Sequence, residues 1–305
     1  MPGEFFAQFM HLRGRHIVES AGTRWYSTNM RIYMNIPFHQ PLELPRAELM
    51  EMMRKNHMLG VRHPSLHRAG LPSGIYVFRQ KRYDLYSIHQ KHRAHVRRGL
   101  ENCEIRQVDE AELLVQGLQC NLDTMERQNR FDSEFGDQRR WQRLVKAVQQ
   151  CPAVSVTGAF VGGRLGAYAI SCCEDGWIQI LHQMSRPDAL AAYPNHALTY
   201  TLTSDAAQDP SVEAVCYGLA GLSSGDGLQQ YKLRFGYELQ SQNSVFLFHP
   251  GVEKLLSSSV VVDGIGSLRR WRPKSEKFKR IESVLIGARM TRLGAAGFNL
   301  APIPE

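Results

Sequence analysis

The strongest constraint on the fold lies between residues 150 and 250, where short β-rich segments alternate with helical patterns. The runs AVSVTGAF and RLGAYAIS favour strands, and the Val-Gly-Gly at 161–163 between them has the composition of a hairpin turn. WIQILHQM predicts a third strand, and Pro194 suits the first turn of a helix with Leu198 and Leu202 on one face. The segment therefore predicts three strands followed by a helix.

The same region continues with another strand, a short helix and a final pair of strands. VEAVCYGLAG predicts a buried strand, and Asp226 is expected to cap a helix that carries Tyr231 and Phe235 on its apolar face. Gly236 is expected to end this helix, and YELQ and SVFLFHP to form the last strand pair. The order β-β-β-α-β-α-β places helices against a mostly central sheet, so we expect an α/β architecture.

Shorter patterns precede this region. RWYSTN, MRIYMNIP, GVRHPSL and GIYVFRQ predict strands, and Pro45 predicts the start of a helix. Ser87 and Gln90 form a capping-box pattern before the basic helix QKHRAHVRRGL, which Gly99 is expected to end, and a second capping box follows at 109–112. Two apolar stripes then predict helices: Leu113, Leu114, Gly117, Leu118 and Leu122, and afterwards Trp141, Leu144, Val145 and Val148.

Composition limits the compartment and the chemistry. The chain has 305 residues, of which 43% are hydrophobic, so it can bury a sizeable core. No apolar run approaches the roughly 18 residues that a membrane-spanning helix needs, and the opening residues lack the apolar run of a signal peptide. We therefore expect a cytoplasmic protein. The six cysteines show no CxxC pair and no His/Cys spacing of a structural zinc site, so no metal site is predicted.

The formal net charge of +8 favours anionic partners. Arg93 and Arg97 lie on one face of the basic helix, and with Arg98 they can contact RNA, a nucleotide or an anionic membrane surface. A basic C-terminal stretch interleaves Trp271 and Phe278 with cations, as an amphipathic helix on a membrane or on RNA would. A solvated basic helix and a loosely packed tail explain the same patterns. The basic residues of this stretch are Arg269, Arg270, Arg272, Lys274, Lys277, Lys279 and Arg280.

Two segments carry a resemblance to a known family. GDGLQQYKLRFGYEL at 225–239, with its Tyr-Lys-x-x-Phe-Gly form, resembles the closing half of the GNAT fold in the FemAB-like branch, the peptidoglycan-bridge aminoacyltransferases of bacteria. YDLYSIHQKHRAHVRRGL at 83–100 is similar to the segment that enters the second repeat of such proteins. The resemblance implies an α/β fold of tandem GNAT-like units, with mixed central sheets flanked by helices. It implies units at 1–86 and 87–250, and a basic extension at 251–305.

The resemblance also implies acyl transfer, but leaves the donor open. GNAT enzymes hold coenzyme A through a glycine-containing loop before a helix N-terminus, and the corresponding stretch here, QMSRPDALAAYPNHALTY, has no glycine. Arg186 and Asn195 remain candidates for binding an anionic donor at that helix. We expect no tightly bound cofactor, and acyl-CoA or aminoacyl-tRNA as the possible co-substrate.

Acyl transfer to an amine needs a base for the nucleophile and often an acid for the leaving group. His182 at the end of a strand, His196 at the start of the next helix, Tyr217 and Tyr231 are the catalytic candidates, although lone histidines and half-buried phenols are more often structural. Lys232 and Arg234 are candidates for binding a phosphate or carboxylate of the donor. Alternatively, both side chains lie on a solvated helix surface and bind no ligand.

The sequence therefore predicts an N-acyltransferase that moves an acyl or aminoacyl group from a thioester or ester donor to a primary amine. A catalytically inactive GNAT-like protein that binds an anionic ligand or partner is the alternative. A nucleic-acid-binding protein is a third reading, which rests on charge alone.

Overall fold

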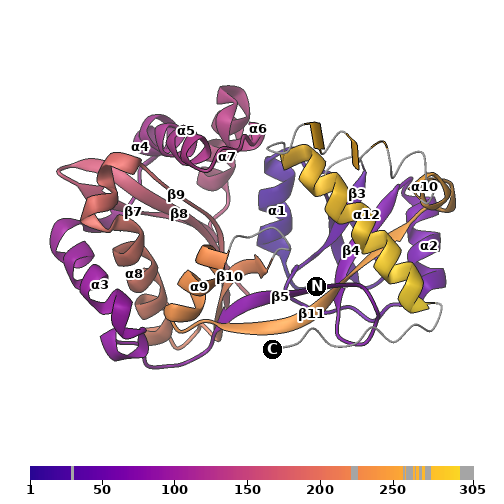
Figure 1. The fold of residues 1–305 in the computed structure, drawn as a ribbon, viewed down its shortest axis with the longest axis horizontal. Coiled ribbons are helices and arrows are strands. Elements are labelled where there is room, and N and C mark those ends of the chain that lie inside the picture. Colours follow the sequence, from indigo (N-terminus) through magenta and orange to yellow (C-terminus); the bar gives the residue numbers. More distant parts are fainter. Residues whose placement is uncertain are drawn as a thin grey trace. The chain divides into compact units, whose positions relative to one another are not determined.

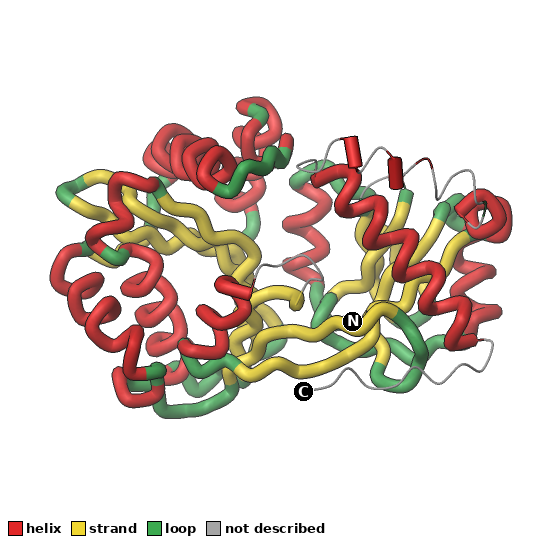
Figure 2. Tube along the Cα trace, viewed as in Figure 1, coloured by secondary structure: helices red, strands yellow, loops and turns green. Residues whose placement is uncertain are grey.

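The computed structural model describes residues 1–28, 31–220, 226–256, 258, 264, 266–267, 270–271 and 276–295. The chain forms two compact units (Figures 1 and 2). Unit 1 comprises Met1–Gly74, Gly221–Ser223 and Ser241–Glu305, and unit 2 comprises Ile75–Ala220 and Ser224–Gln240. Two strands, β5 (Leu71–Phe78) and β11 (Glu238–Phe248), contribute residues to both units.

Unit 1 is built on three antiparallel strands and a fourth that runs parallel to the third. Strands β1, β2 and β3 pair in order, and β4 pairs with β3 in parallel and with β11 in antiparallel fashion. Helix α2 makes the crossover between β3 and β4. The elements are α1 (Glu4–Leu12), β1 (Ile17–Ser20), β2 (Thr23–Ser27), β3 (Ile32–Ile36), α2 (Arg46–Lys55), β4 (Gly60–Ser65), α10 (Pro250–Leu256) and α12 (Glu276–Ala295).

The sheet of unit 1 buries both faces, since successive residues of a strand point to opposite sides. Leu247 of β11 packs in a core with Trp25 and with the predicted stripe of α2. Its neighbours Phe246 and Phe248 lie in a second cluster, against which residues of α12 pack. Helices therefore cover this sheet on two sides. The stripe of α2 consists of Leu49, Met52 and Met53, all buried.

Unit 2 repeats this arrangement and enlarges it. Strands β6, β7, β8 and β9 pair antiparallel in order, and β10 joins β9 in parallel after the crossover helix α8. Helices α3 and α8 lie on one side of these strands, and α5 and α7 lie on the other (Figure 1). The helices are α3 (Gln90–Asn102), α4 (Glu110–Glu112), α5 (Leu118–Arg127), α6 (Ser133–Gly136), α7 (Gln138–Gln150), α8 (Pro194–Gln208) and α9 (Asp226–Arg234). The strands are β6 (Glu104–Gln107), β7 (Val154–Val161), β8 (Arg164–Glu174), β9 (Trp177–Ser185) and β10 (Ala214–Ala220).

The predicted order over residues 150–250 is confirmed, because β7, β8, β9, α8, β10, α9 and β11 follow one another as expected. The hairpin at 161–163 is present, and both of its glycines have positive φ. The compact units divide the chain near residues 74 and 240, and Ser241–Glu305 belongs to unit 1. The boundaries at 86 and 250, with a separate extension, stay predictions about domains.

Three local predictions were wrong, the first two at helix ends. The Ser87 and Gln90 pattern does not open α3: the side chain of Ser87 accepts from Asp84 in the capping box of a 3₁₀ turn, Leu85–Ser87, and His89 caps α3. Gly99 lies inside α3, where a Cβ would stand 2.8 Å from the Tyr193 carbonyl oxygen, so it permits close helix packing. YELQ and SVFLFHP form one continuous strand, since the residues between them remain extended.

The first apolar stripe is only partly confirmed. Leu113 and Gly117 are buried, whereas Leu122 is 39% exposed and Cys120, Thr124 and Met125 are buried in its place. A π-helical turn at Leu113–Gly117 shifts the helix by a fraction of a turn and so changes its buried face. The capping box at 109–112 and the second stripe are confirmed.

None of the described helices combines the length and the hydropathy needed to span a bilayer. The predicted amphipathic C-terminal helix falls largely outside the described residues. Arg269, Arg272 and Lys274 are not described, nor are the side chains of Lys277, Phe278, Lys279 and Arg280. The side chain of Asp226, the expected cap of α9, is also outside the described set.

Candidate functional site

The two parallel strands of unit 2 separate toward their carboxyl ends. Strands β9 and β10 pair at Ala214–Trp177, Val215–Ile178 and Cys216–Gln179, and their ladder stops there although both strands continue. A register shift on the other edge of β9, next to β8, accompanies the separation. The gap thus begins where the ladder between β9 and β10 ends.

A cavity of about 500 Å³ lies at this gap, entirely within unit 2. It brings together five predicted site residues from four elements, β9, α8, β10 and α9: His182, Asn195, Tyr217, Tyr231 and Lys232. Thr124, Arg127, Gln128, Gln183 and Ser185 also line it. The carboxyl ends of parallel strands are a common place for ligands in open α/β sheets.

A chain of hydrogen bonds runs along one wall of the cavity. Arg127 donates to the Ser185 hydroxyl at 3.2 Å, and the Asn195 amide donates to the same oxygen at 2.9 Å. Gln183 in turn donates to Asn195 Oδ1 at 3.1 Å and accepts from the Tyr217 hydroxyl. The wall is therefore a connected polar network, in which each side chain orients the next.

His182 is held in one orientation by Asn121. The amide nitrogen of Asn121 donates to the Phe135 carbonyl at 3.1 Å, which turns its Oδ1 toward His182 Nε2 at 3.3 Å. Since an amide oxygen only accepts, Nε2 carries the ring hydrogen, and a neutral ring has its lone pair on Nδ1. Phe135 stacks on the imidazole with ring centroids 3.8 Å apart. His182 is thus an imidazole of fixed orientation in the cavity wall.

The two predicted phenols differ in their surroundings. Tyr231 donates to the Asn195 carbonyl at 2.9 Å and lies 3.1 Å from Thr199 Oγ1, so its hydroxyl joins α9 to α8. Tyr217 lies within the polar network, 3.4 Å from Thr199. Burial raises the pKa of Tyr217 to about 12 and that of Tyr231 well above its usual range, so both are neutral near pH 7.

Lys232 is a buried cation in the cavity wall, with only 7% of its surface exposed. Its Nζ lies 4.6 Å from the centroid of the Tyr76 ring and 5.0 Å from that of Tyr217, at cation–π range. Burial lowers the Lys232 pKa to about 8, which leaves the amine mostly charged at pH 7. None of the described residues that line the cavity is acidic, so Lys232 and Arg127 make it electropositive.

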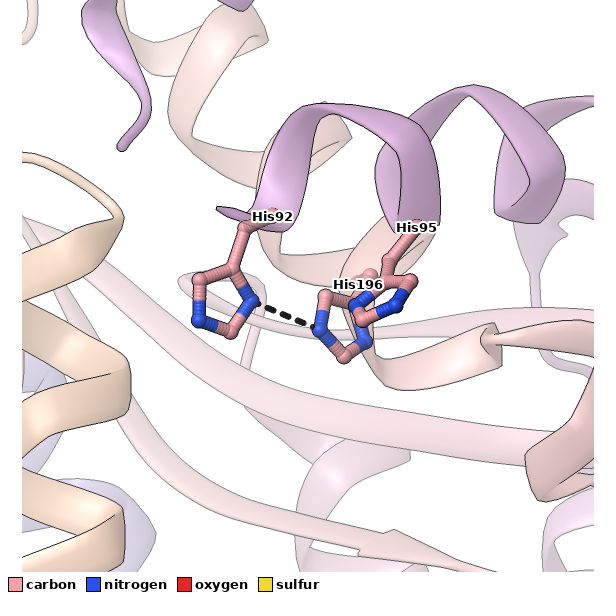
Figure 3. A group of neighbouring side chains, drawn as sticks. All are labelled: His92, His95 and His196. Carbon is pink, nitrogen blue, oxygen red and sulfur yellow. Dashed lines mark hydrogen bonds between the residues drawn. The ribbon is translucent and has the colours of Figure 1, made fainter. Parts of the chain in front are cut away.

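Three predicted site residues lie outside the set that lines this cavity. His196 forms a hydrogen bond with His92 where α3 packs against α8 (Figure 3). Arg186 is 7% exposed and forms an ion pair with Asp188, so its guanidinium is already engaged. Arg234, at the end of α9, acts electrostatically on His92. The roles given to these three residues stay predictions.

Sequence reasoning missed Asn121, Arg127, Gln183, Ser185 and Thr199. None of them stands in a motif, and their polar side chains come from α5, β9 and α8, which lie apart in sequence. Where the resemblance suggested a donor loop, the chain forms a 3₁₀ helix, Pro187–Ala192, and then α8. The stretch that lacks glycine is therefore helical and does not form a loop of the kind that holds coenzyme A in GNAT enzymes.

Repeated β-β-β-α-β topology in both units, with a cavity between diverging parallel strands in the second, defines a tandem GNAT-like fold. No family model matches the sequence, and no curated protein sequence matches it. Solved structures do. FemX is similar at 11% identity over 84% of this chain and 94% of its own, with a TM-score of 0.59.

Two further structures have the same fold. The C-terminal domain (DUF2156) of a putative lysylphosphatidylglycerol synthetase from Agrobacterium fabrum is 11% identical over 82% of this chain and 89% of its own, with a TM-score of 0.55. L-PGS from Bacillus licheniformis is 10% identical over 85% and 91%, with a TM-score of 0.52. At these identities the likenesses show the fold alone, and the predicted FemAB-like fold is confirmed.

Proposed function

We propose that unit 2 is an N-acyltransferase that moves an acyl or aminoacyl group from a thioester or ester donor to a primary amine. The observation that carries the proposal is the cavity between β9 and β10, where an oriented imidazole lies beside two cations. Lysylphosphatidylglycerol synthetase is named for a product that carries a lysyl group, so the likeness to it supports aminoacyl donors.

Direct attack fits the groups present. The amine nitrogen forms a bond to the donor carbonyl carbon as the carbon–sulfur or carbon–oxygen bond breaks, and His182 Nδ1 accepts the amine proton. Backbone N–H groups of the separated strands can polarise the carbonyl, and the leaving group takes a proton from solvent or from Tyr217. Lys232 and Arg127 bind the anionic part of the donor, a phosphate of acyl-CoA or of aminoacyl-tRNA.

The hydrogen bonds of Tyr217 and Tyr231 support different roles for the two phenols. The Tyr231 hydroxyl is bonded to the Asn195 carbonyl, which supports a structural role. Tyr217 lines the cavity, and its hydroxyl donates to Gln183 in the polar network of the wall. Both observations support a role near the donor. We expect Tyr217→Phe to reduce turnover more than Tyr231→Phe does.

The first test is a thermal-shift screen with coenzyme A, acetyl-CoA, and charged and uncharged tRNA, since a ligand of the folded state raises its melting temperature. Donors that shift the protein are then radiolabelled on the acyl group and offered to a pool of primary amines, with phosphatidylglycerol vesicles, which offer only hydroxyl acceptors, as a comparison. Transfer by wild type to an amine supports the proposal, and transfer to phosphatidylglycerol alone would contradict the amine acceptor. A melting shift without transfer, or no shift with any donor, would contradict the acyltransferase and favour the inactive protein that binds another anionic ligand or a partner.

A further inference from the structure

Three histidines meet where α3 packs against the first turn of α8. His92 and His95 are three residues apart on α3 and therefore share one face of that helix, and His196 lies in the first turn of α8 (Figure 3). One ligand nitrogen from each ring lies within 4.8 Å of the others. None of the three rings is fully exposed.

The surrounding packing fixes these rings. Gly99 lets α3 approach α8, because a Cβ there would lie 2.8 Å from the Tyr193 oxygen and 3.1 Å from the Ala197 side chain. Tyr193 stacks on His95 with ring centroids 4.4 Å apart. The cluster thus stands at a close helix crossing.

The nitrogen atoms are arranged for coordination. His92 Nδ1 and His196 Nε2 are 2.9 Å apart, so one donates a hydrogen and the other accepts it, which two protonated rings could not do. Burial lowers the pKa of His196 to about 4, and burial together with Arg234 lowers that of His92, so both rings are neutral near pH 7. His95 Nδ1 is buried and has no hydrogen-bond partner among the described residues.

We propose that His92, His95 and His196 bind a divalent transition-metal ion of the kind that imidazole favours, such as Zn²⁺. Zinc–nitrogen bonds of about 2.0–2.1 Å in a tetrahedral site place ligand nitrogens roughly 3.3 Å apart. The nitrogens here lie within 4.8 Å of one another, and one pair is 2.9 Å apart. Three protein ligands leave one position for a water molecule. The ring that donates in the His92–His196 bond carries its hydrogen on the other nitrogen when the ion binds.

The charges around the three histidines determine how tightly we expect the metal ion to bind. All three ligands are imidazoles, which bind a metal ion without adding negative charge, and the Arg234 guanidinium acts on His92, so the ion keeps its charge near another cation. We therefore expect weaker affinity than in a site with thiolate or carboxylate ligands. The ion would tie α3 to the first turn of α8, beside Asn195 of the cavity wall.

The test measures metal binding and is independent of acyl transfer. Protein stripped with a chelator is titrated with Zn²⁺ by calorimetry, and Zn²⁺-loaded wild type is examined by X-ray absorption spectroscopy. We expect one equivalent of Zn²⁺ per chain, with three imidazole nitrogens and one oxygen around the ion. Wild type that binds no stoichiometric Zn²⁺, or binds it through sulfur or a single imidazole, overturns the proposal without any variant.

Variants then locate the ion. His95→Gln and His196→Gln should each abolish the stoichiometric site, with folding checked by circular dichroism. His89→Asn is the matched control, because His89 is an exposed cap on the same helix and asparagine can cap in its place. Binding that survives in folded His95→Gln, or that is lost in His89→Asn, would show that the triad is not the site.

Discussion

Units 1 and 2 share a topology but differ at the point where their parallel strands part. In unit 1, β3 and β4 pair from Ile32–Gly60 to Met34–Arg62, and the ladder then stops as it does in unit 2. The chain itself closes this gap. The Leu42 amide donates to the Pro64 carbonyl at 2.8 Å, and the buried Asn35 side chain donates to the carbonyls of residues 37 and 40.

In unit 2 the equivalent gap borders a cavity lined by polar and cationic side chains. The segment after β9 folds into a 3₁₀ helix and leads into α8, and the ladder between β9 and β10 does not resume there. The difference teaches that topology alone does not make a ligand site. The residues that follow the third strand decide whether the gap is filled by the chain or remains accessible to a ligand.

The largest effect is expected at His182. His182→Ala should reduce kcat about 100-fold or more, because it removes the oriented base, and should leave the fold intact. Transfer rates and circular dichroism would check this. His67→Ala, at an exposed histidine of unit 1, is the control and should retain full activity. Equal rates in wild type and His182→Ala would remove His182 from the mechanism.

Lys232 should make the stability of the protein depend on pH. Its pKa falls from 10.5 to about 8 on folding, so between these values the unfolded chain binds a proton that the folded chain does not. Stability should therefore rise with pH over this window, by about 3 kcal/mol in total. Lys232→Met should lose this slope in urea unfolding measured from pH 7.5 to 10.5.

Lys55→Met is the matched control in unit 1, because Lys55 is exposed, and it should keep the wild-type slope. A difference between wild type and Lys232→Met that does not change with pH would show that Lys232 is not desolvated as described.

Asn35→Ala tests whether the hydrogen bonds that close the gap between β3 and β4 in unit 1 stabilise the fold and play no part in donor binding. The variant leaves two carbonyls without their donor, and should lower the free energy of unfolding by about 1–3 kcal/mol. Urea unfolding measures this. Donor affinity should not change, so a loss of donor binding in folded Asn35→Ala would place unit 1 in the site and break the comparison.

Arg127 should give the smallest effect. It is exposed, so water and salt screen its charge, and Arg127→Ala should weaken donor binding about fivefold. Titration of the donor at two salt concentrations would measure the change. Arg54→Ala, an exposed position in unit 1, should bind as wild type does. Similar losses in both variants would indicate nonspecific electrostatics.

Local patterns predicted the elements well where side-chain period and turn chemistry agree. The Val-Gly-Gly turn, Pro194 at the start of α8 and the stripe of α7 each stand where expected, because neighbours in sequence determine them. Predictions failed where distant contacts decide. Gly99 stays inside a helix because α8 packs against it, and the π-helical turn at Leu113–Gly117 changes which residues of the next helix are buried.

The cavity could be predicted only in part. The family resemblance pointed to Tyr231 and Lys232, and strand order pointed to His182 and Tyr217, but no pattern linked Asn121 to His182 or Arg127 to Ser185. The histidine cluster shows the same limit. Spacing places His92 beside His95, while His196 is supplied from a helix 104 residues further along the chain.

The sequence by itself determined the α/β class, the order of elements in unit 2 and the branch of the fold, because these depend on periodicity and on a local motif. The tertiary structure alone decided which strands part, which polar groups meet in the gap and which cations line it. Those outcomes depend on burial and on hydrogen bonds between residues far apart in sequence, which a single linear pattern does not encode.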